Sequence, residues 1–332
     1  MIHTECLIIG QGMAGTLLSY ELMMAGKSVM LIDKKDRYST SLVASAVINP
    51  LVGKNWTLAK DAERIIPVAL DTYKHLNQLL NADLVQQKSI LVFHRDALAA
   101  DNFSKQKASG NPYLHENNTE QETPWFAPFG TGEVSPVYTI DAYSLLHQWE
   151  DFLLSKNALL QEHFQFDELT ISEDKIQYKG IVADKIVFCE GPIGRRNPFF
   201  PALNFTQNRG DALLLSIPHL SMEHIYHKDF RLVPHRDNLF WCGSNYIWEY
   251  DSLEPDTDWR KETERELKNW LKLPFEIINH WVAERPTTTG QQALLLQNEQ
   301  HANIYFFNGL GTRGFSAGPS LAKKMAQLLL IE

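Results

Sequence analysis

The stretch CLIIGQGMAG, residues 6–15, decides the fold of this chain. Its first four residues are apolar and predict a short buried strand, and the spacing GxGxxG follows directly at Gly10, Gly12 and Gly15. Residues 13–25 are rich in helix formers, and a second apolar run, residues 29–32, ends at Asp33. A strand, a glycine turn, a helix, a second strand and an acid in this order predict a βαβ unit that binds a dinucleotide.

Each glycine of this turn, and the acid that follows, has a physical role in binding a dinucleotide. Gly10 allows the tight turn, Gly12 lets the backbone approach a pyrophosphate, and Gly15 lets the helix pack closely on the strand. The helix N-terminus holds the anion, and Asp33 accepts a hydrogen bond from a ribose hydroxyl. An acid there disfavours the 2′-phosphate of NADP, so the pattern predicts FAD or NAD and leaves the choice between them open.

A second glycine turn of the same spacing lies near the end of the printed sequence, at Gly309, Gly311 and Gly314. It follows the apolar run 304–307 and opens a predicted helix over residues 315–331. Only 18 residues follow Gly314, too few for a second complete βαβ unit. We expect the backbone N–H groups of residues 311–315 to face the flavin pyrimidine and stabilise negative charge on it. The alternative is a turn that serves packing only.

Composition bounds the function. The 332 residues suggest about two domains. Formal charge is −9, from 31 basic and 40 acidic residues, so we expect a small-molecule partner and no nucleic acid. No apolar run approaches the ~18 residues of a membrane span, and residues 1–10 lack the basic region of a signal peptide, so we expect a cytoplasmic protein with no membrane association. The composition does not indicate the oligomeric state.

The sequence gives little indication of a metal site. Cys6, Cys189 and Cys242 lie far apart in apolar runs, which predicts small buried side chains. Histidines cluster at 219, 224, 227 and 235. Because their spacing matches no common ligand pattern, we expect no metal site.

Six segments, in order along nearly the whole chain, resemble the D-amino-acid oxidase family of FAD-dependent oxidoreductases, which includes glycine oxidase and sarcosine oxidase. Besides the first glycine turn and Asp33, they are TSLVASAVINPLVGK (40–54), ADKIVFCEG (183–191), RGDALLL (209–215), FWCGSNYIWEYD (240–251), the pair Arg285-Pro286 and GLGTRGFSAGP (309–319). The resemblance implies FAD as the cofactor, with contacts from Gly10, Gly12, Met13, Ala14, Gly15, Asp33, Lys34, Ser41, Ala44, Ser45, Gly191, Gly311, Thr312, Arg313, Gly314 and Phe315.

The resemblance also implies the substrate residues. The arginine at the position of Arg285 holds a substrate carboxylate, and an aromatic residue, here Tyr246 or Trp248, covers the substrate. Arg285, Tyr246 and Arg313 are the candidate catalytic residues. The alternatives are a structural ion pair for Arg285 and core packing within a strand for the two aromatic residues.

Two segments depart from the family pattern. Relatives usually carry glycine at the position of Ala46. After the arginine–proline pair they usually carry an acid, a proline and a glycine, where this chain has TTTGQQALLL (287–296). The second departure lies beside the substrate arginine, so it bears on the substrate and on catalytic competence more than on the flavin.

The expected fold is α/β: a Rossmann-like FAD-binding domain and a second α+β substrate domain built on a mostly antiparallel sheet. We assign residues 1–80, 139–208 and 284–332 to the first domain and residues 81–138 and 209–283 to the second. Within them, residues 57–80 predict a helix that Pro67 kinks or splits. In residues 84–138, a strand at 89–93 is followed by a polar, glycine- and proline-rich stretch that predicts loops.

The expected function is oxidation of an amino acid or a secondary amine, with hydride transfer to flavin N5 and hydrolysis of the imine product. Three alternatives remain open at this point: an NAD-dependent dehydrogenase, an oxidase that demodifies a tRNA side chain, and a non-catalytic flavin-binding protein.

Overall fold

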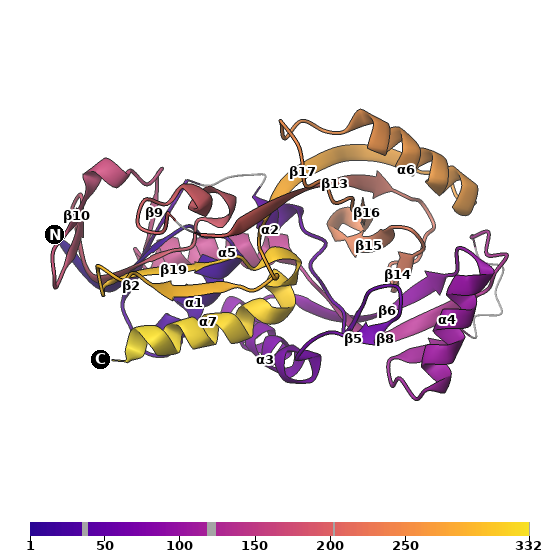
Figure 1. Ribbon diagram of the computed structural model, residues 1–332, viewed down its shortest axis with the longest axis horizontal. Helices are drawn as coiled ribbons and strands as arrows, with labels where there is room; N and C mark the ends of the chain where they lie inside the picture. The colour runs from indigo at the N-terminus through magenta and orange to yellow at the C-terminus, as the bar shows by residue number, and fades with distance from the viewer. Residues whose placement is uncertain (35–38, 118–123, 202, 332) are drawn as a thin grey trace.

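The computed structural model describes residues 1–34, 39–117, 124–201 and 203–331. Two sheets lie side by side, each with its own helices, and they meet near the middle of the molecule (Figure 1). The fold class that the sequence predicts is confirmed: a Rossmann-like sheet is joined to a second, mostly antiparallel sheet.

The first sheet has eight strands in the described residues. They are β1 (Ile2–Ile9), β2 (Val29–Asp33), β9 (Leu159–Gln161), β10 (Leu169–Ile171), β11 (Ile176–Tyr178), β12 (Ile181–Phe188), β18 (Leu294–Gln297) and β19 (Ile304–Asn308). β1 pairs in parallel with β2 and with β12, and β12 pairs in parallel with β19. Because parallel strands end at one edge of a sheet, Gly10, Asp33 and Gly309 come together there.

Both faces of this sheet are buried, as its continuous apolar runs predict. Along β1, Cys6 and Ile8 point into a core shared with helices α1 (Met13–Met24), α3 (Ala62–Leu80), α5 (Ala142–Ser155) and α7 (Gly314–Leu330). Leu7 and Ile9 point into a second core, rich in phenylalanine, on the opposite face. All three cysteines are buried and unpaired, as expected.

The second sheet has nine strands in the described part of the chain. They are β3 (Val47–Ile48), β6 (Val85–Phe93), β7 (Leu114–Glu116), β8 (Thr131–Ile140), β13 (Phe205–Ser216), β14 (His224–His227), β15 (Arg231–His235), β16 (Leu239–Gly243) and β17 (Glu276–Thr288). Helix α6 (Thr257–Trp270) covers one face, through a core that includes Leu213, Leu215 and Trp270 (Figure 1). Helix α4 (Ala97–Ala108) packs near β7 and β8.

Short elements complete the chain. They are helix α2 (Thr40–Val43), the strand pair β4 (Leu51–Val52) and β5 (Thr57–Leu58), and the 3₁₀ helices η1 (Phe166–Glu168), η2 (Gly191–Arg196), η3 (Arg236–Asn238) and η4 (Gly311–Arg313).

The prediction of loops after residue 93 is wrong, because this stretch forms α4, β7 and β8. Helix α4 buries only Phe103, so its apolar periodicity is too weak to recognise, although Asp96 caps it by accepting from the Ala99 N–H. Gly132 leaves room for that phenylalanine, since a Cβ there would lie 2.4 Å from the ring. Pro136 lies where the register between β6 and β8 shifts, so its missing N–H is tolerated.

Two further expectations are corrected. Residues 57–58 form a strand, and helix α3 begins at Ala62 and runs through Pro67 to Leu80, so Pro67 does not split it. A proline in the second turn removes a single backbone hydrogen bond, which the buried face of the helix outweighs. Strand β3, at 47–48, belongs to the second sheet and not to the first, and β8, β13 and β17 cross the predicted domain limits by a few residues. The division into two domains stays a prediction.

We predict that Gly15→Ala lowers the free energy of unfolding by about 3 kcal/mol or more. A Cβ at Gly15 would lie 1.8 Å from the Gly10 carbonyl oxygen, and backbone has to move to admit it. Gly180→Ala is the matched control, because an added Cβ there meets no atom within 4 Å. Urea unfolding of both variants tests this; equal midpoints would contradict the close packing of α1 on the glycine turn.

Candidate functional site

The first glycine turn has the geometry of an anion cradle. Gly10 has φ +101°, and a Cβ there would lie 2.5 Å from the Cys189 carbonyl oxygen, so the turn requires glycine. Helix α1 begins after Gly12, which has no side chain to cap the first N–H groups. A Cβ on Gly12 would meet only the Ser41 hydroxyl among the described atoms within 4 Å. These first-turn N–H groups and the space beside Gly12 suit a pyrophosphate.

Two predicted cofactor residues lie at this turn. Asp33 Oδ1 accepts from the Gln11 N–H at 2.9 Å, and Ser41 Oγ accepts from the Met13 N–H at 3.1 Å. Met13, Ala14 and Gly15 follow in the first turn of α1, and Lys34 follows Asp33 directly. Gly191, with φ +59°, begins η2 just after β12.

The second glycine turn lies on the end of β17. Gly309 and Gly311 have positive φ, and η4 continues directly into α7; neither N-cap residue, Leu310 or Arg313, caps its helix with its side chain. Cβ atoms on these two glycines would lie 3.0 and 3.1 Å from the methyl groups of Thr288 and Thr287. Of the predicted residues here, Thr312 is exposed and Gly314 and Phe315 are buried. Arg313 extends away from the turn, donating from Nη2 to the Lys60 carbonyl at 2.9 Å.

The loop after β2 connects the two sheets. The Thr40 hydroxyl donates to the Glu284 carbonyl on β17 at 2.5 Å, and the Trp241 indole on β16 donates to the Val43 carbonyl at 2.9 Å. Ala44 and Ser45 follow in the same loop and line a cavity of about 290 Å³ together with residues of β6, β8 and the start of α5. Ala46 has φ +52°, which explains why glycine is the usual residue at this position.

Arg285 lies on β17 opposite Asn208 of β13. Its Nη1 donates to Asn208 Oδ1 at 2.5 Å and to the Asn245 carbonyl at 3.4 Å, and its Nη2 donates to Ser244 Oγ at 2.7 Å. Burial lowers the pKa of this guanidinium. No carboxylate of the described residues forms an ion pair with it, so the alternative of a structural ion pair is wrong there.

Room for this side chain depends on Gly210. A Cβ at that position would lie 2.1 Å from Arg285 Nη2. Arg285 and Thr287 are two residues apart on one strand, so their side chains share a face and stand roughly 7 Å apart along it. Because Thr287 contacts the second glycine turn, Arg285 lies beside that turn.

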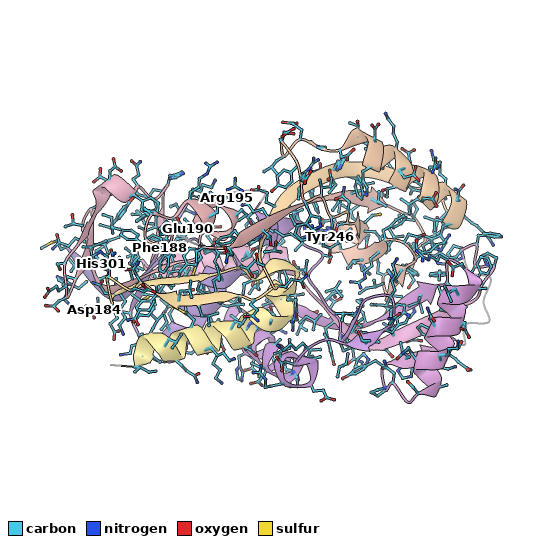
Figure 2. The ribbon with its side chains drawn as sticks, viewed as in Figure 1. Asp184, Phe188, Glu190, Arg195, Tyr246 and His301 are labelled. Atoms are coloured by element: carbon cyan, nitrogen blue, oxygen red, sulfur yellow. The ribbon has the colours of Figure 1, made fainter. Side chains whose placement is uncertain are left out.

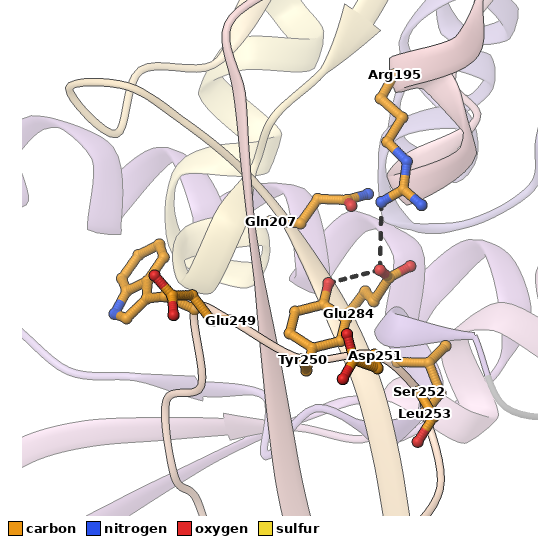
Figure 3. Close-up of a pocket in the computed structure, with 9 residues that line it drawn as sticks. Arg195, Gln207, Glu249, Tyr250, Asp251, Ser252, Leu253 and Glu284 are labelled. Carbon is orange, nitrogen blue, oxygen red and sulfur yellow. Dashed lines mark hydrogen bonds and ion pairs between the residues drawn. The ribbon is translucent and has the colours of Figure 1, made fainter.

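The aromatic residues Tyr246 and Trp248 lie outside the strands, after β16 ends at Gly243. Each is 56% exposed, so the alternative of core packing is wrong for both. The Tyr246 ring centroid lies 4.6 Å from the Arg285 guanidinium carbon, a cation–π contact. Tyr246 lies near the middle of the molecule (Figure 2). Trp248 lines a cavity of about 690 Å³ together with Glu284, which faces the other side of β17 (Figure 3).

The segment that departs from the family pattern has a structural role. Thr287 and Thr288 are buried; Thr287 donates to the Thr206 carbonyl, and Thr288 donates to the Gln292 carbonyl at 2.5 Å. Their methyl groups support the second glycine turn, as described above. The residues of this segment thus support the second glycine turn, and the hydrogen-bond partners of Arg285 described above lie outside it.

The sequence patterns did not point to Glu190. It follows β12 at the edge where Gly10 lies, and a Cβ on Gly10 would come within 3.5 Å of its Cα (Figure 2). Its carboxyl accepts from Asn197 Nδ2 at 2.8 Å, and burial raises its pKa to about 7. The acid in FCEG, directly after a buried strand and beside a glycine, was the available clue.

Comparison with known proteins identifies the family. The family model described as FAD dependent oxidoreductase (DAO) matches residues 5–328. The chain belongs to this family. FAD is therefore its cofactor, and the NAD alternative is set aside.

Solved structures share the fold of this DAO-family chain. Glycine oxidase from Bacillus cereus ATCC 14579 has TM-score 0.81 at 14% identity, covering 98% of this chain and 94% of the other. Iminodiacetate oxidase from Chelativorans sp. BNC1 has TM-score 0.78 at 16% identity, covering 98% and 95%. L-alpha-glycerophosphate oxidase from Mycoplasma pneumoniae, a structure with FAD bound, has TM-score 0.76 at 14% identity, covering 100% and 96%. At these identities the likeness shows the fold.

Other kinds of site have less support. Among residues 1–34, 39–117, 124–201 and 203–331, no group of three His, Cys, Asp or Glu side chains is arranged to hold a metal ion. Within the same residues, every helix is too short or too polar to cross a bilayer. Burial lowers the pKa of His227, one of the clustered histidines, to about 3.

We predict that Gly12→Ala folds normally and weakens FAD binding at least tenfold, a loss of about 1.4 kcal/mol. The backbone of Gly12 is extended (φ −76°, ψ −166°), which alanine also adopts, but the methyl group would occupy the approach to the first turn of α1. Flavin fluorescence titration of the apoprotein gives the FAD Kd, and thermal unfolding gives the stability. An unchanged Kd would contradict the assignment of this turn to the pyrophosphate.

We predict that Glu190→Gln stabilises the apoprotein at about pH 8 by up to ~3 kcal/mol and has no effect at about pH 4. The native pKa of about 7 lies above the ordinary value of 4.5, so the native state holds the extra proton between these values. Stability is therefore full below pH 4.5 and falls as the pH rises through 7. Parallel stability–pH curves for the two proteins would refute the burial of this carboxyl.

Proposed function

We propose that this chain oxidises a small amine or amino acid that carries a carboxylate. The observation that supports it is Arg285, a half-buried guanidinium bonded to an amide oxygen, a hydroxyl and a backbone carbonyl, with no carboxylate of the described residues paired to it. A buried charge without a counterion is unfavourable, and a substrate carboxylate supplies the missing charge through two parallel hydrogen bonds.

The surroundings of Arg285 suit a substrate beside the flavin. FAD, when bound, accepts a hydride and so supplies the redox chemistry. Thr287, which contacts the second glycine turn, lies on the same face of β17 as Arg285. The Thr40 hydroxyl, next to Ser41, donates to the carbonyl of Glu284, the residue before Arg285. These contacts link the Ser41 loop and the second glycine turn to the strand that carries Arg285, which supports a substrate position beside the flavin.

In this proposal the protein orients the substrate. Arg285 fixes the carboxylate, and the Tyr246 ring covers the guanidinium on its exposed side. The amine loses a hydride from carbon and a proton from nitrogen, and water hydrolyses the imine outside the reaction step. First-turn N–H groups of η4 and α7 supply dipoles that stabilise negative charge on the flavin pyrimidine.

The fold alone does not choose the substrate. Glycine oxidase and iminodiacetate oxidase are named for small amines that carry carboxylates, whereas glycerophosphate oxidase is named for a phosphate ester. The uncompensated Arg285 favours the first class. The three unpaired, buried cysteines fit a reducing compartment, and we propose a cytoplasmic location.

Anaerobic bleaching of the flavin tests the proposed function directly. The panel pairs each carboxylated amine with its counterpart that lacks the carboxylate: glycine with methylamine, and sarcosine with dimethylamine; it adds iminodiacetate, L-proline and glycerol 3-phosphate. The proposal expects bleaching by at least one carboxylated amine and faster reduction than by its counterpart. Bleaching by glycerol 3-phosphate alone, or by nothing in the panel, would count against it.

We predict that Arg285→Met lowers kcat/KM for the active carboxylated amine about 100-fold, since it removes two charge-assisted bonds worth ~3 kcal/mol together. The ratio of kcat/KM between this amine and its counterpart should collapse toward one. FAD affinity, measured in parallel, serves as the control and should stay unchanged. A preserved preference for the carboxylated amine would remove Arg285 from the substrate site.

A further inference from the structure

Three segments meet at Glu284, the residue before Arg285 on β17. Its carboxylate Oε1 accepts from the Tyr250 hydroxyl at 2.6 Å and pairs with Arg195 Nη1 at 3.3 Å (Figure 3). Its backbone carbonyl accepts from the Thr40 hydroxyl at 2.5 Å. Because successive side chains alternate along a strand, this carboxylate and the Arg285 guanidinium lie on opposite faces of β17.

Each of the three segments leads to a part of the site. Thr40 precedes Ser41, which bonds the first glycine turn. Arg195 belongs to η2, which begins at Gly191. Tyr250 belongs to the loop after β16, residues 244–256, and the start of this loop holds the guanidinium from the other face: Ser244, Asn245 and Tyr246 are its partners.

The bond to Tyr250 is the strongest of the side-chain contacts. The Glu284 side chain is only 15% exposed, which protects its hydrogen bonds from water. Burial and this bond raise the pKa of Tyr250, so its hydroxyl remains a donor. Arg195 is 37% exposed, and an ion pair with that much solvent contributes little.

Packing does not hold the Tyr250 segment. Residues 248–253 line the cavity of about 690 Å³ beside Glu284, and Trp248 and Leu253 are exposed. Both ends of this loop are bonded to β13: Asn245 bonds to Asp211 and Ile247 pairs with the Arg209 backbone near its start, and near its end Arg209 Nη2 donates to the Glu254 carbonyl and the Asp256 N–H donates to Asp211. Between these ends, among the described residues, the Tyr250–Glu284 bond is the hydrogen bond that joins residues 248–253 to the neighbouring strand. A loop with open space beside it shifts when such a bond is lost.

We propose that Glu284 is a positioning residue, which fixes the 244–250 segment through Tyr250 so that Arg285 is held in place for a substrate carboxylate. The inference rests on the proposed role of Arg285. The face of β17 that carries Glu284, opposite Arg285, would thus contribute to carboxylate binding without contacting the substrate.

The experiment measures carboxylate binding and FAD binding separately in the holoenzyme. Acetate and benzoate are titrated against the flavin visible spectrum to obtain their Kd values, and KM and kcat are measured for the active amine of the panel. Tyr250→Phe keeps the ring and removes the hydroxyl. We expect it to raise the carboxylate Kd and the KM about five- to tenfold, with kcat for the bound substrate and the FAD Kd unchanged.

The chain offers a matched control. In the first sheet, Glu162 Oε1 accepts from the Tyr178 hydroxyl at 2.7 Å and from Lys179 Nζ at 2.6 Å, the same chemistry away from Arg285. Tyr178→Phe should leave the carboxylate Kd unchanged. Glu284→Gln keeps an oxygen for Tyr250 and should have a smaller effect than Glu284→Ala, which should match or exceed Tyr250→Phe.

The outcomes separate the two proposals. If Arg285→Met weakens carboxylate binding but Tyr250→Phe and Glu284→Ala do not, the positioning role is wrong and the proposed function stands. If neither acetate nor benzoate perturbs the wild-type flavin spectrum, or if Arg285→Met leaves their Kd values unchanged, the carboxylate site itself is refuted. If Tyr178→Phe raises the carboxylate Kd as much as Tyr250→Phe does, the effect at Tyr250 reflects a general loss of stability, and the inference is wrong.

Discussion

The pairing of β13 with β17 holds the parts of the candidate site together. It runs from Phe205 opposite Thr288 to Ser216 opposite Glu276, with one register shift beyond Leu214. One end lies in the second sheet beneath α6, and the other supports the glycine turn before α7. Because the side chains of a strand alternate, the same ribbon presents Arg285 on one face and Glu284 on the other.

In the proposed function, the charge of Arg285 gives this frame its part in substrate binding. A guanidinium placed among neutral oxygens loses hydration without gaining a counterion, which is unfavourable. Such an arrangement is typical of a binding site, where an anionic ligand supplies the counterion. Gly210 leaves the space for the guanidinium, and the two glycine turns open helices whose N-terminal dipoles suit a second, larger anion. In the proposed function, FAD and a substrate carboxylate thus both bind to donors that the fold has already positioned.

Local patterns predicted the parts of the fold that short segments decide. The two glycine turns, Asp33 and the parallel strands followed from spacing and apolar runs, and the family resemblance pointed to Ser41 and Arg285. Contacts between distant segments were beyond such patterns: Tyr250 and Arg195 reach Glu284 across 34 and 89 residues. Strand β8 was missed because its glycine and proline are explained only by Phe103 and by the shifted register opposite them.

The central claim is that Arg285 receives a carboxylate beside the flavin. A crystal structure of the FAD complex with benzoate tests it most directly. The account predicts both carboxylate oxygens at about 2.8 Å from the guanidinium nitrogens, with Tyr246 against the same group and the ligand beside the flavin ring. Benzoate bound elsewhere, or a guanidinium paired with a protein carboxylate in that complex, would contradict it.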